Sequence, residues 1–392
     1  MRPLDGITVV TLEHAVAAPF ASRQLADLGA RVIKIERPGV GDFARNYDDR
    51  VDGLASYFVW TNRSKESLTL DVKHPDAKGI LERLVGEADV LLQNLAPGAA
   101  ARLGLTYDQL AQVNPQLIVC NISGYGPDGP YRDRKAYDLL VQAEAGLLSV
   151  TGTPDNPSKA GVSAADIAAG MYAYSNILAA LIQRGKTGKG CTIEISMLEA
   201  LAEWMSYPMY YAYNGAPPPD RAGASHSTIF PYGPFLVGDG SIVILGLQNE
   251  REWAAFCTTV LQQTTVLEDP RFAGNAERTK NRKALTDIIV AAFKPLEGAT
   301  VIARLESAGI ANAQLNEMAD LWNHPQLKER DRWTSVGSPA GPLPALLPPG
   351  GFEGYKPRMD PVPKLGEHNT DVLQGLGYSH REIKAFQKNG VV

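Results

Sequence analysis

The start of the chain alternates between strand and helix patterns, and this alternation restricts the fold more than any other feature. The segment "ITVVTLEH" has the apolar run of a buried strand, "PFASRQLADLGA" has helical spacing and ends at Gly29, and "RVIKIER" predicts a second strand. A strand, a helix and a strand in this order form a βαβ unit, whose two strands run parallel. We therefore expect the chain to begin with such a unit.

The same alternation resumes further along the chain. "ADVLLQN" and "LIVCNISGYG" predict strands, and "LTYDQLAQVNP" between them predicts a helix. This repetition favours an α/β fold with a large Rossmann-like domain, whose mostly parallel sheet is covered by helices on both faces. A dinucleotide-binding turn would carry G-x-G-x-x-G after the first strand, but the turn reads "EHAVAAPFAS", without glycine. We therefore expect no NAD site there.

Two proline-rich stretches indicate how the chain divides into domains. Regular patterns stop at "YNGAPPPDRAGAS" and again at "GSPAGPLPALLPPGG", with a hairpin-like segment and helical segments between them. We predict a large α/β domain whose N-terminal part is residues 1–213, and a smaller inserted α+β domain over residues 214–330. Residues 331–392 are predicted to form a linker and a C-terminal return to the large domain.

The composition is that of a soluble globular protein. Of the 392 residues, 44% are hydrophobic and 21% are charged, and the formal net charge of -5 argues against a nucleic-acid partner. The longest mostly apolar stretch, residues 167–182, contains Tyr, Ser and Asn, so it predicts a core helix and no membrane partner. The N-terminus predicts a strand and not a signal peptide. A cytoplasmic location is expected.

Cysteine and histidine spacings exclude several site types. The three cysteines are far apart and form no C-x-x-C, so they predict neither a disulfide framework nor a zinc site, and they fit a reducing cytosol. The six histidines lack spacings such as H-E-x-x-H, and no G-x-S-x-G is present. We expect no bound metal and no esterase chemistry of the G-x-S-x-G type.

Asp166 begins a long helical pattern, "ADIAAGMYAYSNILAALIQRGKTGKG", and allows two interpretations. Ser163 and Asp166 have the S-x-x-D spacing of a capping box, in which both side chains bond to amides of the first helical turn. Alternatively, Asp166 is a nucleophilic carboxylate that the helix N-terminus keeps ionised. The local sequence favours the cap, because caps are much more common than nucleophiles.

Cationic residues follow several predicted strands. Ligands of parallel sheets bind at the loops that leave the carboxyl ends of the strands, and phosphates need several Lys or Arg donors. Single surface cations are usually just solvated, so we expect more than half of these residues to be bystanders. They are Lys34, Arg37, Arg45, Arg63, Lys65, Lys73, Arg102 and Lys135.

Six ordered blocks resemble the class III CoA-transferases, also called the formyl-CoA transferase or carnitine CoA-transferase-like family. In that family a catalytic aspartate opens a helix that runs into an R-x-x-T-G-x-G turn, and Asp166 matches it. The resemblance implies an enzyme that forms aspartyl anhydride and aspartyl-CoA thioester intermediates on Asp166. The blocks are "LDGITVVTLEHAVAAPFASRQLADLGARVIKIERPGVGD", "NRSKESLTLDVKHPDAKGILERLVGEADVLLQNLAPGAAARLGL", "ISGYGPDGPY", "KAYDLLVQAEAGLLSVTG", "ADIAAGMYAYSNILAALIQRGKTGKG" and "GEHNTDVLQGLGY".

The resemblance also implies that coenzyme A is a co-substrate and that no cofactor is bound permanently. Many relatives carry an arginine where Ala96 stands in "QNLAPG", so a side-chain contact at that position is not expected here. The family's CoA contacts correspond in this sequence to Arg37, Lys73, Asn94, Arg102, Lys135 and Tyr137.

Departures from related sequences bear on the reaction and the substrate. α-Methylacyl-CoA racemases of the same fold place a histidine at the position of Tyr137, and a tyrosine of ordinary pKa is a poor partner base for α-proton exchange. Val16 stands where formyl-CoA:oxalate enzymes carry glutamine, so oxalate is not the expected acceptor. A racemase or epimerase and a non-catalytic acyl-CoA binder are the alternatives to a transferase.

The resemblance is strongest to relatives acting on four- and five-carbon dicarboxylic acids, such as itaconate, mesaconate or malate, with succinyl-CoA as the expected donor. A second carboxylate needs a cationic or hydroxyl anchor. The candidates, with Val16 beside them at the substrate position, are Arg45, Tyr47, Arg221 and His226. Relatives form interlocked homodimers, so a homodimer is expected.

Overall fold

The computed structural model describes residues 1–351 and 353–392, which divide into two compact units. Unit 1 comprises residues 1–145, 160–205 and 327–392, and unit 2 comprises residues 146–159 and 206–326. Unit 1 contains a parallel sheet and unit 2 an antiparallel one, so the predicted α/β class is confirmed.

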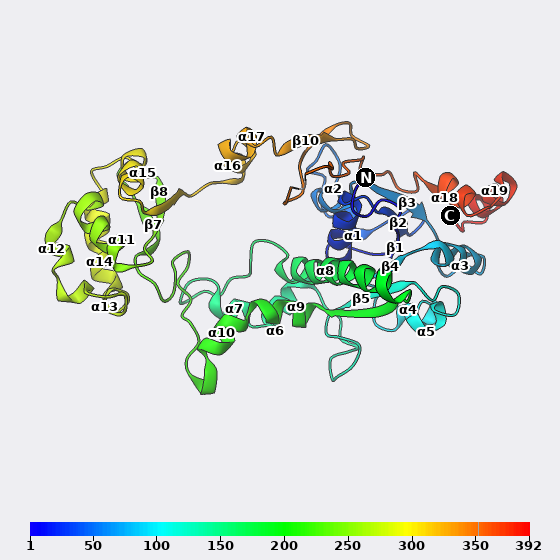
Figure 1. The fold of residues 1–392 in the computed structure, drawn as a ribbon, viewed down its shortest axis with the longest axis horizontal. Helices are drawn as coiled ribbons and strands as arrows, with labels where there is room; N and C mark the ends of the chain where they lie inside the picture. Colours follow the sequence, from blue (N-terminus) through cyan, green and yellow to red (C-terminus); the bar gives the residue numbers. More distant parts are fainter. Residues whose placement is uncertain (352) are drawn as a thin grey trace. The chain divides into compact units, whose positions relative to one another are not determined.

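Unit 1 is built on a six-stranded sheet with the order β3-β2-β1-β4-β5-β6 (Figure 1). Every neighbouring pair is parallel, with Val10 opposite Ile33 on one side and opposite Leu91 on the other. The order reverses direction beside β1, which gives the sheet a topological switch point between β1 and β4. The strands are β1 Thr8–Leu12, β2 Arg31–Glu36, β3 Lys65–Thr69, β4 Val90–Gln93, β5 Ile118–Ser123 and β6 Cys191–Ser196.

Helices cover both faces of this sheet. Alternate strand residues, such as Val10 and Ile33, join a core cluster with α3 Ala77–Glu87, α18 Asn369–Gly375 and α19 His380–Lys388. The opposite face is covered by α1 and α8, which pack on each other and on the strands. The remaining regular elements of unit 1 are η1 Phe43–Asn46, α2 Ser56–Asn62, α4 Ala99–Arg102, α5 Tyr107–Leu110, α6 Asp138–Glu144, α9 Met197–Trp204 and the hairpin β10 Trp333–Val336 with β11 Leu343–Leu346.

The long helix α8 Ala164–Thr187 approaches α1 Ala17–Asp27 very closely. A Cβ added at Gly170 would lie 2.7 Å from the Ala17 carbonyl oxygen and 3.0 Å from a ring carbon of Phe20. By length and composition α8 could also cross a membrane, which is weak support when a single helix passes the test. Burial of its alanine-rich face against α1 accounts for the composition, as expected for a core helix.

Unit 2 combines a small antiparallel sheet with helices around its own core. The sheet has the order β7-β8-β9, and β7 and β8 form the hairpin that the sequence indicated. The elements are α7 Leu147–Val150, α10 Ser206–Tyr211, η2 Tyr213–Gly215, β7 Tyr232–Leu236, β8 Ile242–Gly246, α11 Glu250–Ala255, η3 Phe256–Val260, α12 Thr264–Leu267, η4 Pro270–Phe272, α13 Asn275–Lys280, α14 Arg282–Phe293, α15 Gly298–Ser307, β9 Ala311–Gln314 and α16 Met318–Trp322. The short helix α17 Pro325–Glu329 spans the boundary between the units.

Residues 146–159 belong to unit 2, although the sequence analysis left them in the large domain. The Gly223 amide donates to the Gly152 carbonyl oxygen at 2.8 Å, and the Arg221 Nε donates to the Thr153 carbonyl oxygen at 2.9 Å. These bonds join two segments about seventy residues apart in sequence. A proline-rich stretch marks where regular structure stops, but it does not reveal such a pairing.

The close approach of α1 and α8 predicts the effect of two glycine substitutions. Gly170→Ala places a methyl group against backbone that cannot move freely, so the free energy of unfolding should fall by about 1–3 kcal/mol. Gly185→Ala lies on the same helix with nothing within 4 Å, and should raise it by up to ~1 kcal/mol. Urea unfolding measures both values, and equal effects would contradict the account.

Candidate active site

The loops after β1 and β4 flank the switch point of the sheet, and Asn94 joins them. Its side-chain Oδ1 accepts from the His14 amide and its Nδ2 donates to the His14 carbonyl oxygen, both at 2.9 Å. The His14 ring stacks on Phe43, with ring centres 4.6 Å apart. The amide side chain of Asn94 therefore fixes the backbone at the carboxyl end of β1, where open α/β sheets bind their ligands.

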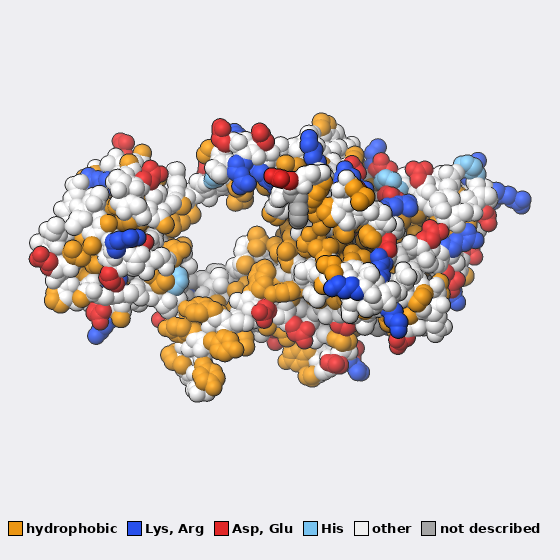
Figure 2. All heavy atoms as spheres, viewed as in Figure 1, with side chains coloured by type: hydrophobic (Ala, Val, Ile, Leu, Met, Phe, Trp, Pro, Cys, Tyr) orange, Lys and Arg blue, Asp and Glu red, His pale blue; other side chains and the backbone are white. Residues whose placement is uncertain are grey.

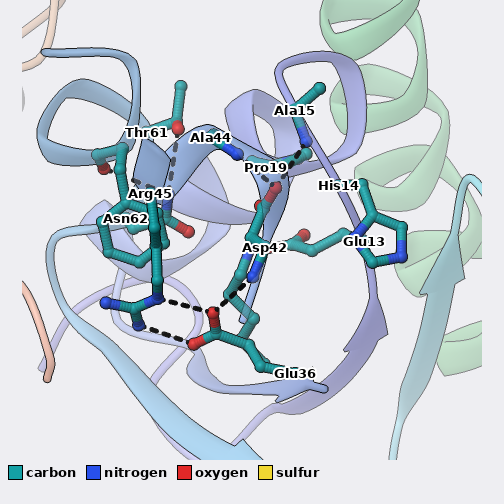
Figure 3. Close-up of polar contacts among 12 residues, drawn as sticks. Glu13, His14, Ala15, Pro19, Glu36, Asp42, Ala44, Arg45, Thr61 and Asn62 are labelled. Atoms are coloured by element: carbon teal, nitrogen blue, oxygen red, sulfur yellow. Dashed lines mark hydrogen bonds and ion pairs between the residues drawn. The ribbon is translucent and has the colours of Figure 1, made fainter. Parts of the chain in front are cut away.

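A fully buried network of ion pairs lies beneath the loop that follows β1 and supports it. The Lys34 Nζ lies 2.7 Å from Asp42 and 3.3 Å from Glu13, and the Lys65 Nζ lies 2.6 Å from Glu13. Asp42 also accepts from the Ala15 amide at 3.0 Å, which holds Ala15 at a φ of 61° that non-glycine residues rarely adopt (Figure 3). The sharp turn from β1 into α1 thus depends on buried charge.

The network keeps its carboxylates ionised. Burial alone would favour the neutral carboxyl group, but Lys65 and Lys34 hold the pKa of Glu13 below its ordinary value. Likewise Lys34 and the bonds from Ala15 and Ala44 overcome burial and lower the pKa of Asp42. Each of these two buried carboxylates therefore has a cationic partner, as a charge in the nonpolar interior of a protein requires.

The N-terminus of α8 has a different arrangement, and the predicted capping box is wrong. Ser163 is the N-cap residue but its side chain makes no capping bond. Instead the Oδ1 of Asp138, at the start of α6, accepts from the Ala165 amide at 2.8 Å and from the Asp166 amide at 3.2 Å. A side chain distant in sequence has taken the capping role. Among residues 1–351 and 353–392, the carboxylate of Asp166 has no hydrogen-bond donor.

This environment raises the pKa of Asp166 to about 7, first through burial and then through the negative charge of Asp138. The carboxylate is thus ionised in a large fraction of molecules at neutral pH, yet it is poorly solvated. A desolvated carboxylate without bonded donors is a better nucleophile than one in water. Tyr47 lies near enough that the Asp166 charge contributes to raising the pKa of the phenol, after burial and Asp42.

The cations that follow the strands separate into two groups. Four have internal carboxylate partners: Lys34 and Lys65 in the buried network, Arg45 on Glu36, and Arg63 on Asp27. The other four are exposed and form no ion pair within the described part of the chain. They are Arg37, Lys73, Arg102 and Lys135.

Lys135 and Tyr137 lie on the segment that leads into α6. Lys135 lines an open pocket of about 540 Å³ together with Tyr125, Arg134 and residues of α6. Tyr137 is the N-cap residue of α6, and 69% of it is exposed. Both therefore lie within a few residues of Asp138, at the N-terminal end of α6.

Two of the proposed substrate anchors are occupied by structural contacts. The Arg45 guanidinium makes two bonds of 2.7 Å to Glu36 and lies 3.8 Å over the ring of Phe58. The Arg221 guanidinium donates to the carbonyl oxygens of Thr153 and Pro154, within unit 2. Because their donors are used inside the fold, the structure gives these arginines structural roles in place of the anchoring roles suggested by their sequence positions.

The other substrate candidates differ in what they can offer. His226 accepts from two backbone amides through Nδ1 and stacks on Tyr232 in unit 2. Val16 is 2% exposed and precedes α1, so it contributes packing at the end of the β1 loop. Tyr47 is half exposed and stacks edge-on against Tyr57. Of these candidates, Tyr47 is the one that interacts electrostatically with Asp166.

The sequence analysis missed Asp138, although it quoted the block "KAYDLL" that contains it. Gln142 supports it by donating to the Asp138 Oδ2 at 2.6 Å, while its own Oε1 accepts from the Ala160 amide at 2.9 Å. An acid at the first position of a short helix was the available signal. From sequence alone Asp138 cannot be distinguished from other acidic residues in the first turn of a helix, because its contact with α8 exists only in the folded chain.

Comparisons with known proteins identify the family of this chain. The chain matches the family described as CoA-transferase family III over residues 4–369. Human succinyl-CoA:glutarate CoA-transferase is 33% identical over 402 residues, covering 100% of this chain and 90% of that protein. Acetyl-CoA:oxalate CoA-transferase of Acetobacter aceti is 35% identical over 374 residues, covering 94% of each chain. A CAIB/BAIF family protein from Brucella suis has a crystal structure with a TM-score of 0.85 and 36% identity, covering 96% of this chain and 99% of that one.

An α/β fold of this topology, matched over nearly its whole length by sequence and by structure, defines a CoA-transferase. The chain belongs to CoA-transferase family III, and the resemblance seen in the sequence is confirmed. Its substrates are therefore CoA thioesters and carboxylic acids. Within residues 1–351 and 353–392, no group of three or more His, Cys, Asp or Glu side chains is arranged to hold a metal ion.

The buried network predicts a large effect of Lys34→Met. This change leaves the Glu13 and Asp42 carboxylates short of a cation in the core, so the free energy of unfolding should fall by about 3–5 kcal/mol. Arg31→Met is the control, because Arg31 pairs with Glu66 in a partly exposed bridge that contributes less than ~1 kcal/mol. Similar losses by urea unfolding in both variants would refute the structural role of the network.

Proposed function

We propose that this CoA-transferase moves CoA from succinyl-CoA to a C4–C5 dicarboxylic acid, with Asp166 as the nucleophile. The observation that carries the proposal is the Asp166 carboxylate itself, which lies at the start of α8 without a bonded donor and with a raised pKa. The name of the human relative pairs succinyl-CoA with glutarate, a C5 dicarboxylate. Glutarate therefore joins itaconate, mesaconate and malate as an acceptor to test.

The proposed reaction begins with two exchanges at carbonyl carbons. An Asp166 oxygen attacks the carbonyl of succinyl-CoA, so an acyl–oxygen bond forms and the carbon–sulfur bond breaks, releasing the CoA thiolate. The thiolate then attacks the aspartyl carbonyl of this mixed anhydride. Succinate leaves as a carboxylate, and an aspartyl-CoA thioester remains. One thioester is broken and another is formed, so no proton or oxidant is required.

Two mirror-image exchanges complete the transfer. The acceptor carboxylate attacks the aspartyl thioester carbonyl and expels the CoA thiolate, which gives a second anhydride. The thiolate then attacks the acceptor carbonyl, forming the new acyl-CoA and restoring the Asp166 carboxylate. Water must be kept from the activated aspartyl carbonyl throughout, and the burial of Asp166 contributes to this exclusion.

The four exposed, unpaired cations support a site for the CoA phosphates. Arg37 and Lys73 follow the carboxyl ends of β2 and β3, and Arg102 ends the short helix α4 after β4. Phosphate oxygens bind best to Arg and Lys donors that have no competing carboxylate. We assign the phosphates to these three residues, and place Asn94, Lys135 and Tyr137 along the rest of the CoA molecule.

The site that binds the acceptor acid must also bind succinate, the acid that the donor succinyl-CoA releases. Succinyl-CoA leaves succinate, a C4 dicarboxylate, so a site that handles succinyl-CoA already tolerates a second carboxylate. Tyr47 is our candidate for a contact to the acyl or acceptor group, because its phenol is half exposed and interacts with the Asp166 charge. Arg45 is no longer a candidate, since Glu36 occupies its donors.

A homodimer is part of the proposal. Figure 2 shows hydrophobic side chains gathered over α10. Exposed apolar groups of this kind usually mark a surface that another chain covers. The side chains of α10 that contribute, with exposed fractions of 46–79%, are Tyr207, Met209, Tyr210 and Tyr211.

Asp166→Asn should abolish transfer while leaving the fold intact. Asparagine has the same shape but is not a nucleophile under these conditions, so the rate should fall on the order of 10³-fold or more. Formation of glutaryl-CoA from succinyl-CoA and glutarate is followed by liquid chromatography, with itaconate, malate and oxalate as parallel acceptors. Asp155→Asn, an exposed acid in unit 2, is the control. Full activity of Asp166→Asn would show that Asp166 is not the nucleophile. Transfer to oxalate alone would show that the acceptor is not a C4–C5 dicarboxylic acid.

Arg102→Ala should selectively weaken binding of the acyl-CoA substrate. Loss of one phosphate contact should raise KM for succinyl-CoA about tenfold or more, with KM for the acceptor unchanged. Arg271→Ala is the control, because Arg271 is exposed but pairs with Asp269 in unit 2. Steady-state kinetics with each substrate varied in turn measures both constants. An unchanged KM for succinyl-CoA would remove Arg102 from the site.

A further inference from the structure

The α8 N-terminus presents an unusual pairing of two carboxylates. Asp138 accepts from the amides of Ala165 and Asp166, so the residue proposed as nucleophile is bonded through its backbone to a second acid. Carboxylates that cap helices normally stabilise negative charge by using the free amides. Here the amides are used by Asp138, and the Asp166 carboxylate is left near a like charge, with no bonded donor among the residues that the structure describes.

We propose that Asp138 is a positioning residue, which fixes the backbone of Asp166 and uses its own charge to disfavour the free Asp166 carboxylate relative to its acylated forms. The inference rests on the proposed function of Asp166. In each anhydride and in the thioester Asp166 is neutral, so repulsion from Asp138 is present before the attack and absent after it. Asp138 thereby raises the energy of the resting carboxylate and favours acylation.

Contacts around Asp138 hold it in place for this role. Gln142, one turn along α6, donates to the Asp138 Oδ2 at 2.6 Å, and its Oε1 accepts from the Ala160 amide at 2.9 Å. The Gln142 side chain is fully buried. The segment that leads into α8 is therefore tied to α6 at Ala160, Ala165 and Asp166 through two side chains. This arrangement fixes the Asp138 carboxylate relative to the backbone of Asp166.

Other ionisable groups near α8 do not share the effect. The pKa of Asp166 is raised by burial and by Asp138 alone, and the nearby Tyr47 phenol is neutral when Asp166 titrates. The remaining charged groups on the helices and strands packed against α8 do not perturb it. They are Arg23 and Asp27 on α1, Glu144 on α6, Glu194 on β6, and Glu199 and Glu203 on α9.

The test compares pH–rate profiles of neutral variants at position 138. With a pKa of about 7, roughly one-tenth of Asp166 is ionised at pH 6, so the wild-type rate there should be roughly one-tenth of the rate at high pH. Asp138→Asn retains an acceptor for the amides but removes the charge, which lowers the pKa of Asp166. The acid limb should move to lower pH, and the plateau rate should fall by roughly tenfold.

Controls separate the failure of this inference from other failures. Glu199→Gln removes an exposed charge from α9, which also packs against α8, and should leave the acid limb unmoved. Asp138→Ser is a second neutral variant, because the new amide of Asp138→Asn faces the Gln142 donor. An acid limb that stays in place in both folded variants overturns the role of Asp138. An active Asp166→Asn would instead overturn the proposed function, whatever Asp138 does.

Discussion

The site depends on how this fold handles charge away from water. A parallel sheet covered on both faces has a dry interior, yet the β1 loop needs polar contacts to turn into α1. The buried contact of Lys34 with Glu13 and Asp42 solves this problem, and Asp42 in turn holds the Ala15 amide. Because α1 follows that turn and α8 packs on α1, with Gly170 against Ala17, the buried network supports the end of α1 that lies closest to Asp166 in the packing of the two helices.

Unit 1 contains acidic side chains with lowered pKa values and one with a raised pKa. Glu13 and Asp42 are matched by ammonium groups, which lower their pKa values and make them inert structural anions. Asp166 forms no ion pair within the described residues, and burial together with the charge of Asp138 raises its pKa to about 7. The partners make the difference, because Glu13 and Asp42 are the more completely buried of these acids and still have lowered pKa values. Buried carboxylates within one unit can thus differ in pKa according to their partners.

Periodicity predicted the α/β class and the opening βαβ unit, because strand and helix spacing are local properties and parallel pairing follows from their order. It did not predict β3 or the place of residues 146–159 in unit 2. Asp166 was identified from the family blocks, since its local pattern favoured a cap with Ser163. That cap is absent because Asp138, twenty-eight residues earlier, occupies the amides. The roles of Arg45 and Arg221 could not be read from sequence either, because both depend on partners that only folding brings close. Local patterns describe elements, whereas sites are made by contacts between them.

The central claim is that Asp166 becomes acylated during transfer, and hydroxylamine tests it directly. The protein is incubated with succinyl-CoA, treated with hydroxylamine, digested and analysed by mass spectrometry. An activated aspartyl carbonyl is intercepted as a hydroxamate, so the account predicts this modification on the peptide containing Asp166, dependent on succinyl-CoA. An unmodified Asp166 peptide from enzyme that is turning over under the same conditions would contradict the covalent mechanism.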